Sequence, residues 1–253
     1  MSDITTLDQI VASKAAQDGF VRTRWFWFRH APVVVDEGRI YGQSDLPCDC
    51  SDTRTFVSLA ASLPRQAIWI TSNLARARQT AQAIFAAGDF TPAPELVADK
   101  DLAEQNLGDW QGLDRRTFLM NWRQEPDSFW YASADERAPN GESFVDLMER
   151  VGAAIARVTQ QYHGRDIVAV AHGGTIRAAI AIALRLPPRG GFAFMIDNCS
   201  LTRLDHYQNK QESGWRVTMI NHRPEFRGIC YARHSLRARF DGARVGVLAK
   251  VRG

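Results

Sequence analysis

Short apolar runs alternate with longer segments of helical periodicity along most of this chain, and this order limits the folds that are open to it. Residues 67–70 and 167–171 are continuous apolar runs with the length of strands that are buried on both faces. Further strand patterns lie at 23–28, 200–207 and 215–220. Strands separated by helices in this way favour a parallel sheet that is covered by helices on both faces.

Three helices are predicted from apolar side chains that recur every three or four residues. The apolar stripes run from Leu74 to Phe85, from Phe144 to Val158 and from Ile176 to Leu184. We expect Ser72 or Asn73 to cap the first helix, Gly164 to close the second and Pro187 to stop the third. The predicted fold class is therefore α/β, with a mostly parallel central sheet.

The pattern divides into a central body and three less regular segments. No repeat, low-complexity stretch or long linker interrupts the 253 residues, so we expect a single domain over residues 1–253. Residues 105–140 mix Trp, Arg and Asp without a sustained stripe, and we interpret them as an insertion that forms a lid. Residues 1–20 form an N-terminal extension, and residues 223–253 form a basic C-terminal extension.

The basic charge of the chain is concentrated near its C-terminal end. Residues 223–253 contain eight Lys or Arg and two acidic residues, whereas residues 1–222 contain 23 basic and 26 acidic residues. A nucleic-acid-binding protein is expected to spread basic charge over a face and to mix aromatic residues into it. No stretch approaches the roughly 18 apolar residues of a membrane helix, and no apolar signal core is present at the N-terminus. We therefore expect a cytoplasmic protein without a nucleic-acid or membrane partner.

Polar residues follow three of the predicted strands directly. In an open α/β sheet, ligands bind beyond the carboxyl ends of the strands, so residues at these positions are candidates for a site. They are Arg29 and His30 after the first strand, Thr71, Ser72 and Arg76 after the second, and His172, Gly173 and Gly174 after the third. Two histidines and two arginines are therefore expected to meet at one edge of the sheet.

These residue types suit phosphoryl transfer. Arginine binds phosphate oxygens in a bidentate fork, and histidine can form a covalent intermediate through a free ring nitrogen. The turn at Gly173 and Gly174 opens a helix and offers N–H donors to a phosphate. The set lacks a carboxylate cluster for Mg²⁺ and a nucleotide-binding Gly-rich loop, and Cys48-x-Cys50 lacks further ligands for zinc. We therefore expect phosphohistidine chemistry without a metal or cofactor.

Further short motifs accompany these strand ends in a fixed order. They are RHA at 29–31, TSNLARA at 71–77, LAE at 102–104, LGDWQG at 107–112, PNGES at 139–143 and AHGG at 171–174. Together they resemble the histidine phosphatase superfamily, which has the phosphoglycerate mutase-like fold, over about residues 23–222. The resemblance implies a three-layer αβα sandwich with a small lid insertion and a metal-independent activity.

The resemblance also implies a role for each matching residue. His30 would be the nucleophile that accepts the phosphoryl group. Arg29, Arg76 and His172 would bind the phosphoryl oxygens and stabilise the charge of the transition state. Glu104 would protonate the leaving alcohol and then deprotonate the water that hydrolyses the phosphohistidine. Glu104 is chosen over the acidic residues near it on this match alone.

The chain departs from the family pattern at two places. Ala31 follows the nucleophile where the family usually has glycine, which lets the backbone approach a phosphate closely. Cys48 lies where a leucine is usual, and the glycine expected a little later is missing. These departures concern substrate contacts more than the chemistry of the phosphohistidine.

The first interpretation is a phosphatase that hydrolyses a small phosphorylated metabolite, a phosphomonoester, through phosphohistidine at His30. A cofactor-dependent phosphoglycerate mutase with the same site is the second, and the motif at 107–112 together with the short insertion favours the phosphatase over it. A third is a non-catalytic member that binds a phosphorylated ligand. α-Ribazole phosphatase is one branch to consider, and a homodimer is a further expectation, with the basic extension packed on the body or on a partner subunit.

Overall fold

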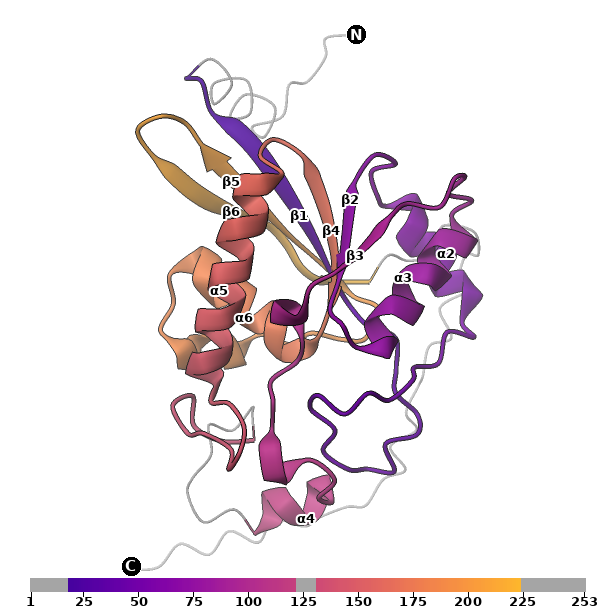
Figure 1. Cartoon of the computed structure of the whole chain (residues 1–253), viewed down its shortest axis with the longest axis vertical. Helices are drawn as coiled ribbons and strands as arrows, with labels where there is room; N and C mark the ends of the chain where they lie inside the picture. Colours follow the sequence, from indigo (N-terminus) through magenta and orange to yellow (C-terminus); the bar gives the residue numbers. More distant parts are fainter. Residues whose placement is uncertain (1–17, 122–130, 224–253) are drawn as a thin grey trace, which may run out of the picture.

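A six-stranded sheet forms the centre of the protein, which was obtained as a computed structural model that describes residues 18–121 and 131–223 (Figure 1). The strand order is β3-β2-β4-β1-β5-β6. The strands are β1 Val21–Arg29, β2 Ile68–Thr71, β3 Leu96–Ala98, β4 Asp166–Ala171, β5 Leu201–Gln208 and β6 Ser213–His222. The described residues exclude most of the N-terminal extension, the middle of the insertion and nearly all of the C-terminal extension. The expectations stated for these segments therefore fall outside the described residues.

Four strands are parallel, and two complete the sheet as an antiparallel hairpin. β2 pairs in parallel with β3 and β4, and β4 pairs in parallel with β1. β5 is antiparallel to β1 and to β6. A short loop can join only antiparallel neighbours, whereas each parallel pair needs a helical crossover. The predicted α/β class with a mostly parallel sheet is therefore confirmed.

One face of the sheet is covered by α5 (Phe144–Gln161) and α6 (Gly173–Leu184). Alternate side chains of a strand point to opposite faces, and Trp25 and Trp27 of β1 both point toward this layer. Their rings stack at a centroid distance of 4.9 Å and are fully buried. The two helices and the sheet share one continuous apolar core.

The opposite face is covered by α2 (Thr53–Ala61) and α3 (Ala75–Ala87) (Figure 1). Phe26 and Phe28, which alternate with the two tryptophans along β1, lie in this second core. The αβα arrangement implied by the family resemblance is thus present, with a separate apolar core on each side of the sheet.

Two predicted helix boundaries are wrong. The N-cap of α3 is Leu74, which makes no side-chain capping bond, and not Ser72 or Asn73. The Ser72 hydroxyl instead contacts the ring of His172. Helix α5 ends three residues before Gly164, so this glycine adopts its positive φ of 79° in the following turn and does not close the helix.

The described parts of the insertion lie beyond the carboxyl ends of the parallel strands (Figure 1). They contain α4 (Arg115–Met120) and pack through Trp110 and Ala138 against Ile40, which belongs to the loop after β1. Short 3₁₀ turns complete the chain at η1 Lys100–Leu102, η2 Gly108–Trp110 and η3 Pro188–Ala193. The insertion and the loop after β1 therefore form one small apolar cluster near the site-bearing edge.

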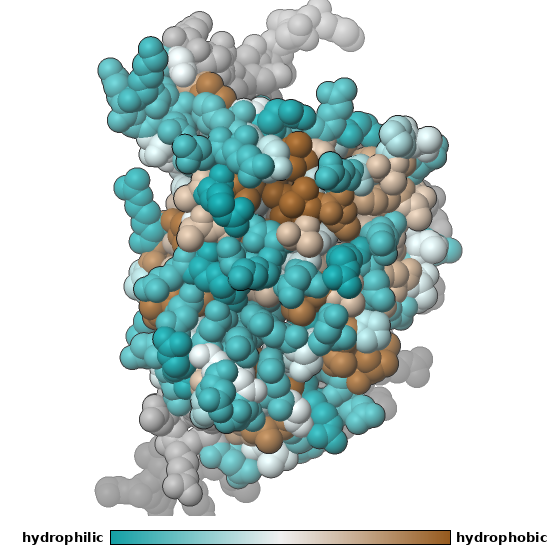
Figure 2. Space-filling view, viewed as in Figure 1, coloured by the Kyte–Doolittle hydropathy of each residue, from teal (hydrophilic) through white to brown (hydrophobic). Residues whose placement is uncertain are grey.

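Hydrophilic side chains cover most of the face seen in Figure 2, with small hydrophobic clusters between them. Within residues 18–121 and 131–223, no helix is long and apolar enough to cross a membrane.

Candidate active site

The carboxyl ends of β1, β2 and β4 lie next to one another because these three strands are neighbours in the sheet. His30 follows β1 and His172 follows β4, and the centroids of their rings are 5.1 Å apart. Arg76, in the first turn of α3, donates from Nε to Nδ1 of His172 over 3.3 Å. Arg29 is the last residue of β1. The topology therefore brings together the two histidines and two arginines that the sequence predicted.

The ring of His30 has a defined orientation. Its Nδ1 lies 2.7 Å from the carbonyl oxygen of Ala31, and because a carbonyl oxygen only accepts hydrogen bonds, Nδ1 carries the proton. In the neutral ring, the lone pair is then on Nε2. The main chain of His30 is also fixed, since its N–H donates to the Ala171 carbonyl at 3.0 Å and its own carbonyl accepts from Nδ2 of Asn198 at 2.8 Å.

Burial and nearby positive charge keep both rings neutral. His30 is 1% exposed and His172 is fully buried. Desolvation lowers the pKa of each histidine well below 6.5, and the charges of Arg76 and Arg29 lower both pKa values further. A neutral ring with a free Nε2 is the form of His30 that can attack an electrophile.

The second histidine is held by hydrogen bonds at both ring nitrogens. Because Nδ1 of His172 accepts from Arg76, the proton of the neutral ring is on Nε2, which donates to Oγ of Ser72 over 2.7 Å. The same Ser72 oxygen accepts from the N–H of Leu74 at 3.2 Å. The residue that the sequence suggested as a helix cap therefore orients a ring of the site.

Arg76 is fully buried and fixed by the loop that follows β1. Its Nη1 donates to the carbonyl of Ser44 at 2.7 Å, and its Nη2 donates to the carbonyl of Gly42 at 2.6 Å. The guanidinium also lies over the ring of Tyr41, 5.1 Å from the centroid. Burial lowers the pKa of Arg76, while the charge of Glu104 opposes that shift. The side chain is thus preorganised before any ligand arrives.

Arg29 retains an unused donor. Its Nη1 donates to the carbonyl of Ile196 at 2.7 Å. Its Nε is buried, and no acceptor among the described residues is within hydrogen-bond distance. A buried donor without a partner is costly, and Nε can donate to an anionic oxygen of a ligand.

The carboxylate of Glu104 lies at the N-terminus of α6, immediately after His172. Its Oε1 accepts from the N–H of Gly174 and from the N–H of Gln105, each at 3.0 Å. Nε2 of Gln43 donates to the Glu104 carbonyl at 2.8 Å and fixes the main chain there. A carboxyl group oriented in this way beside the two histidines can exchange a proton with a bound ligand.

Arg177 is a residue of this site that the sequence reasoning missed. A Cβ placed on Gly173 would lie 3.2 Å from Nη1 of Arg177 and 3.6 Å from Nε of Arg29, so both guanidinium groups adjoin this glycine. Nε of Arg177 donates to the carbonyl of Phe194 at 2.8 Å. A signal was present, because Arg177 is the single charged residue in the segment GGTIRAAIAIAL that forms α6.

The structure explains why alanine is accommodated at position 31. Ala31 does not have a positive φ, and its side chain is fully buried in the core beside α2 and α3. Its N–H donates to Oγ1 of Thr80 at 2.8 Å and is therefore already satisfied within the protein. The backbone here therefore needs no glycine.

Cys48 contacts the back of the Arg76 segment. Its Sγ donates to the Arg76 carbonyl at 3.3 Å, and its N–H donates to Oε1 of Gln79 at 3.0 Å. Cys50 lies close to it, with the two sulfur atoms 3.6 Å apart and not joined in a disulfide. Burial raises the pKa of Cys50 to about 12. The Cys48 thiol thus supports the main chain behind the site.

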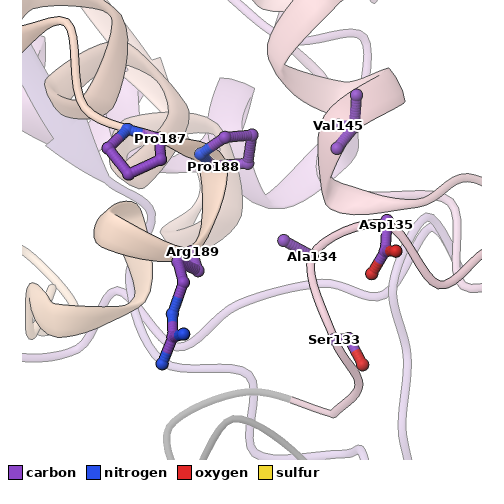
Figure 3. A pocket seen from close by; sticks show the side chains of 7 residues that line it. All are labelled: Ser133, Ala134, Asp135, Val145, Pro187, Pro188 and Arg189. Carbon is purple, nitrogen blue, oxygen red and sulfur yellow. The ribbon is translucent and has the colours of Figure 1, made fainter.

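Two further questions about the candidate site are whether it holds a metal-binding cluster and whether a cavity adjoins it. Within the part of the chain that the structure describes, no group of three or more His, Cys, Asp and Glu could hold a metal ion. Figure 3 shows a cavity of about 460 Å³ between the start of α5, η3 and the second part of the insertion. It is lined by Ser133, Ala134, Asp135, Val145, Pro187, Pro188 and Arg189. The predicted site residues are absent from this lining.

The fold and the site together define an α/β protein that gathers two histidines and three arginines at one edge of its sheet. A model of the histidine phosphatase superfamily (branch 1) matches residues 26–221, and the chain belongs to this family. The family resemblance read from the sequence is therefore confirmed.

Its relatives include proteins named as mutases and as phosphatases. The chain is 31% identical over 188 residues to the probable phosphoglycerate mutase GpmB of Escherichia fergusonii, which covers 72% of this chain and 84% of that protein. The mycobacterial glucosyl-3-phosphoglycerate phosphatase has a TM-score of 0.65 and 28% identity, covering 78% of this chain and 98% of its own. A putative alpha-ribazole-5'-P phosphatase from Escherichia coli shares the fold, with a TM-score of 0.62 and 24% identity over 79% of this chain and 97% of its own. These comparisons support an enzyme of the phosphatase or mutase type.

Proposed function

We propose that this protein is a phosphatase that hydrolyses a small phosphomonoester through a phosphohistidine on Nε2 of His30. One observation supports this most strongly: the hydrogen bond from Nδ1 to the Ala31 carbonyl leaves Nε2 as the free nucleophilic atom of a neutral, buried ring. The open Nε of Arg29 supplies a donor for a phosphoryl oxygen beside it.

In the first step, the Nε2 lone pair of His30 forms a bond to phosphorus as the bond from phosphorus to the ester oxygen breaks. The leaving alkoxide takes a proton from the carboxyl group of Glu104. Arg29 and Arg76 bind the equatorial oxygens, where negative charge is concentrated in the transition state. His172 accepts a hydrogen bond from Arg76 and helps to hold that guanidinium against the phosphoryl group.

In the second step, water attacks phosphorus and the bond to Nε2 breaks. The Glu104 carboxylate takes the proton from this water, so the carboxyl group returns to its starting state and inorganic phosphate is released. The reaction consumes one water and needs no metal ion for charge balance, because the guanidinium groups supply the positive charge.

A cofactor-dependent phosphoglycerate mutase is the alternative that the GpmB relatives support. Both reactions share the first step and differ in whether water or a second hydroxyl group accepts the phosphoryl group. The two can be separated by adding 3-phosphoglycerate with a trace of 2,3-bisphosphoglycerate. Rapid formation of 2-phosphoglycerate without phosphate release would overturn the phosphatase proposal.

Turnover of p-nitrophenyl phosphate is the basic test of the enzyme. We expect phosphate release without added metal, undiminished by a chelator, and a screen of phosphorylated metabolites should then identify the natural substrate. If the purified protein neither turns over this ester nor takes up acid-labile phosphate, the chain is a non-catalytic member that binds a phosphorylated ligand.

A further inference from the structure

Residues 194–199 form a loop between η3 and β5, and we refer to it as the clamp loop. It contacts Arg29, the last residue of β1, and His30, which follows it. The Ile196 carbonyl accepts from Nη1 of Arg29 at 2.7 Å. Nδ2 of Asn198 donates to the carbonyl of His30 at 2.8 Å. The clamp loop therefore sets both the direction of the Arg29 guanidinium and the position of the His30 main chain.

The last residue of the clamp loop has an unfavourable backbone conformation. Cys199 has a φ of 58°, which lies in the left-handed region and is strained for a residue with a side chain. In this conformation its N–H donates to the carbonyl of Arg29 at 3.0 Å. Strain of this kind persists only where the surrounding structure fixes it, so the loop needs anchors on the rest of the protein.

Two side chains provide these anchors from different elements. Nε of Arg177, on α6, donates to the carbonyl of Phe194 at the start of the clamp loop, over 2.8 Å. Asn221, on β6, accepts from the N–H of Asp197 at 2.6 Å and donates from Nδ2 to the Asp197 carboxylate at 3.1 Å. Each anchor thus joins the clamp loop to an element of the packed body.

The Arg177 guanidinium also lies close to the group that the clamp loop directs. Both Arg177 and Arg29 adjoin Gly173, as the Cβ distances of 3.2 and 3.6 Å show. Burial lowers the pKa of Arg177; the charge of Glu104 opposes this shift, and the charge of Arg29 adds to it. Two like charges held together in a buried place are stabilised when an anion binds between or beside them.

We propose that Arg177 is a positioning residue, which fixes the clamp loop through the Phe194 carbonyl and so aims the open Nε of Arg29 at a phosphoryl oxygen. This inference rests on the proposed function and goes beyond it, because it assigns the orientation of the phosphate-binding arginine to a helix residue and a loop that lie outside the six sequence motifs. Asn221 holds the same loop farther along the chain, at Asp197.

A double-mutant cycle tests whether Arg177 acts through Arg29. The variants are Arg177→Met, Arg29→Met and the two combined, measured as kcat and KM for p-nitrophenyl phosphate and as the affinity for inorganic phosphate by calorimetry. We expect Arg177→Met to lower kcat/KM and phosphate affinity by roughly 10- to 100-fold, as for loss of a hydrogen bond to a charged group. In the Arg29→Met background the same change should have almost no further effect.

Two matched variants control for the loss of a buried side chain. Arg177→Lys keeps a charged donor for the Phe194 carbonyl and should recover part of the activity. Arg78→Met removes an exposed arginine that also donates to a backbone carbonyl, that of Asn73 at 2.7 Å, and should leave activity unchanged. Equal, additive losses in the single and double variants would overturn the inference. So would a loss confined to substrates that carry a second acidic group, because Arg177 would then contact the substrate directly.

Asn221→Gly keeps the measurement informative if Arg177→Met fails to fold. Glycine accepts the φ of 52° at this position and removes only the two side-chain bonds to Asp197. We expect weaker phosphate binding here as well, again without an additional effect in the Arg29→Met background. The phosphate titration also separates the two proposals: an inactive protein that still loses phosphate affinity in these variants contradicts the phosphatase but not the role of Arg177.

Discussion

The two sides of the candidate site are built in different ways. One side, which we call the phosphoryl-binding side after its proposed role, consists of Arg29, His30, Arg76 and His172. These residues lie at the ends of adjacent strands or in the first turn of the helix after one, and they are held by main-chain carbonyls and by each other. The proton-transfer side is Glu104, which comes from an irregular segment after η1 and is oriented by the amides at the start of α6.

This difference separates the part of the site fixed by the sheet from the part attached to it. The strand order β2-β4-β1 brings Arg29, His30 and His172 to one edge, and Arg76 follows β2 in the first turn of α3, so the placement of this side follows from the fold. The position of Glu104 depends in addition on Gln43 and Arg150, whose side chains donate to its carbonyl at 2.8 and 3.3 Å. We expect changes on the first side to affect every substrate, and changes on the second to depend on the leaving group.

The largest effect is expected on the phosphoryl-binding side. Arg76→Met removes a fully buried guanidinium aimed at the site, and kcat/KM should fall by about 100- to 1,000-fold for all substrates, as for removal of a preorganised donor. Arg76→Lys should recover little, since a single ammonium cannot replace the fork bound to Ser44 and Gly42. Arg78→Met is the control. If the decrease in kcat/KM of Arg76→Met differed widely between substrates, the proposed difference between the two sides of the site would be contradicted.

The next effect tests the other side. Glu104→Gln cannot give up or take a proton, so hydrolysis of an alkyl phosphate should slow by about 100-fold, whereas formation of the phosphoenzyme from p-nitrophenyl phosphate should slow by less than about 10-fold. The reason is that a nitrophenolate leaves without protonation. Single-turnover rates for the two esters measure the contrast, and equal losses would remove Glu104 from the acid role.

The burial of the two neutral histidines predicts a pH dependence of stability. The pKa values of His30 and His172 are well below 6.5 in the folded protein, while in the unfolded chain they are near 6.5. Below that pH the unfolded chain binds protons that the folded protein does not. The free energy of unfolding should therefore fall by about 1 kcal/mol per histidine between pH 7.5 and 5.5.

Urea unfolding at the two pH values provides the measurement. In a variant with His30→Gln and His172→Gln, the decrease should be smaller by about 2 kcal/mol than in the unchanged protein. Changing the exposed Arg78 to Met, which alters no histidine, should leave the decrease as it was. An identical pH dependence in all three proteins would show that these two rings are not held neutral by the fold.

The smallest effect is expected at position 31. Ala31→Gly removes one fully buried methyl group and adds backbone freedom to the unfolded chain, which together should lower the free energy of unfolding by about 1 kcal/mol. Activity should stay within about twofold, because the N–H that bonds to Thr80 is retained. Thermal unfolding and steady-state kinetics test both statements. A large gain in activity would show that the alanine methyl obstructs the phosphate.

The sheet could be predicted because its strands are strongly patterned. The runs at 67–70 and 167–171 are apolar throughout, and the structure buries them as β2 and β4 at the centre. In contrast, β3 has three residues, of which two are exposed, so it has no pattern to detect. Helix α2 was also missed, since it has only nine residues and the first three of them are polar, which leaves a short apolar pattern.

The candidate site could be predicted only where its residues follow strands. Arg29, His30 and His172 are adjacent to strand ends, so topology alone locates them. The clamp loop and Arg177 act largely through backbone carbonyl oxygens, which every residue has, and no periodicity or residue type reports such contacts. Ser72 was misinterpreted for a related reason: a serine before a helix resembles a cap, and only the position of His172 shows its actual partner.

The central claim is that Nε2 of His30 becomes phosphorylated during turnover, and rapid-quench labelling tests it most directly. The protein is mixed with a ³²P-labelled phosphomonoester, quenched in alkali, digested and sequenced, with His30→Gln and the exposed His163→Gln as the matched pair. We predict an acid-labile, alkali-stable label on the peptide that contains His30, absent in His30→Gln and unchanged in His163→Gln. Turnover without this label, or a label that persists in His30→Gln, would contradict the account.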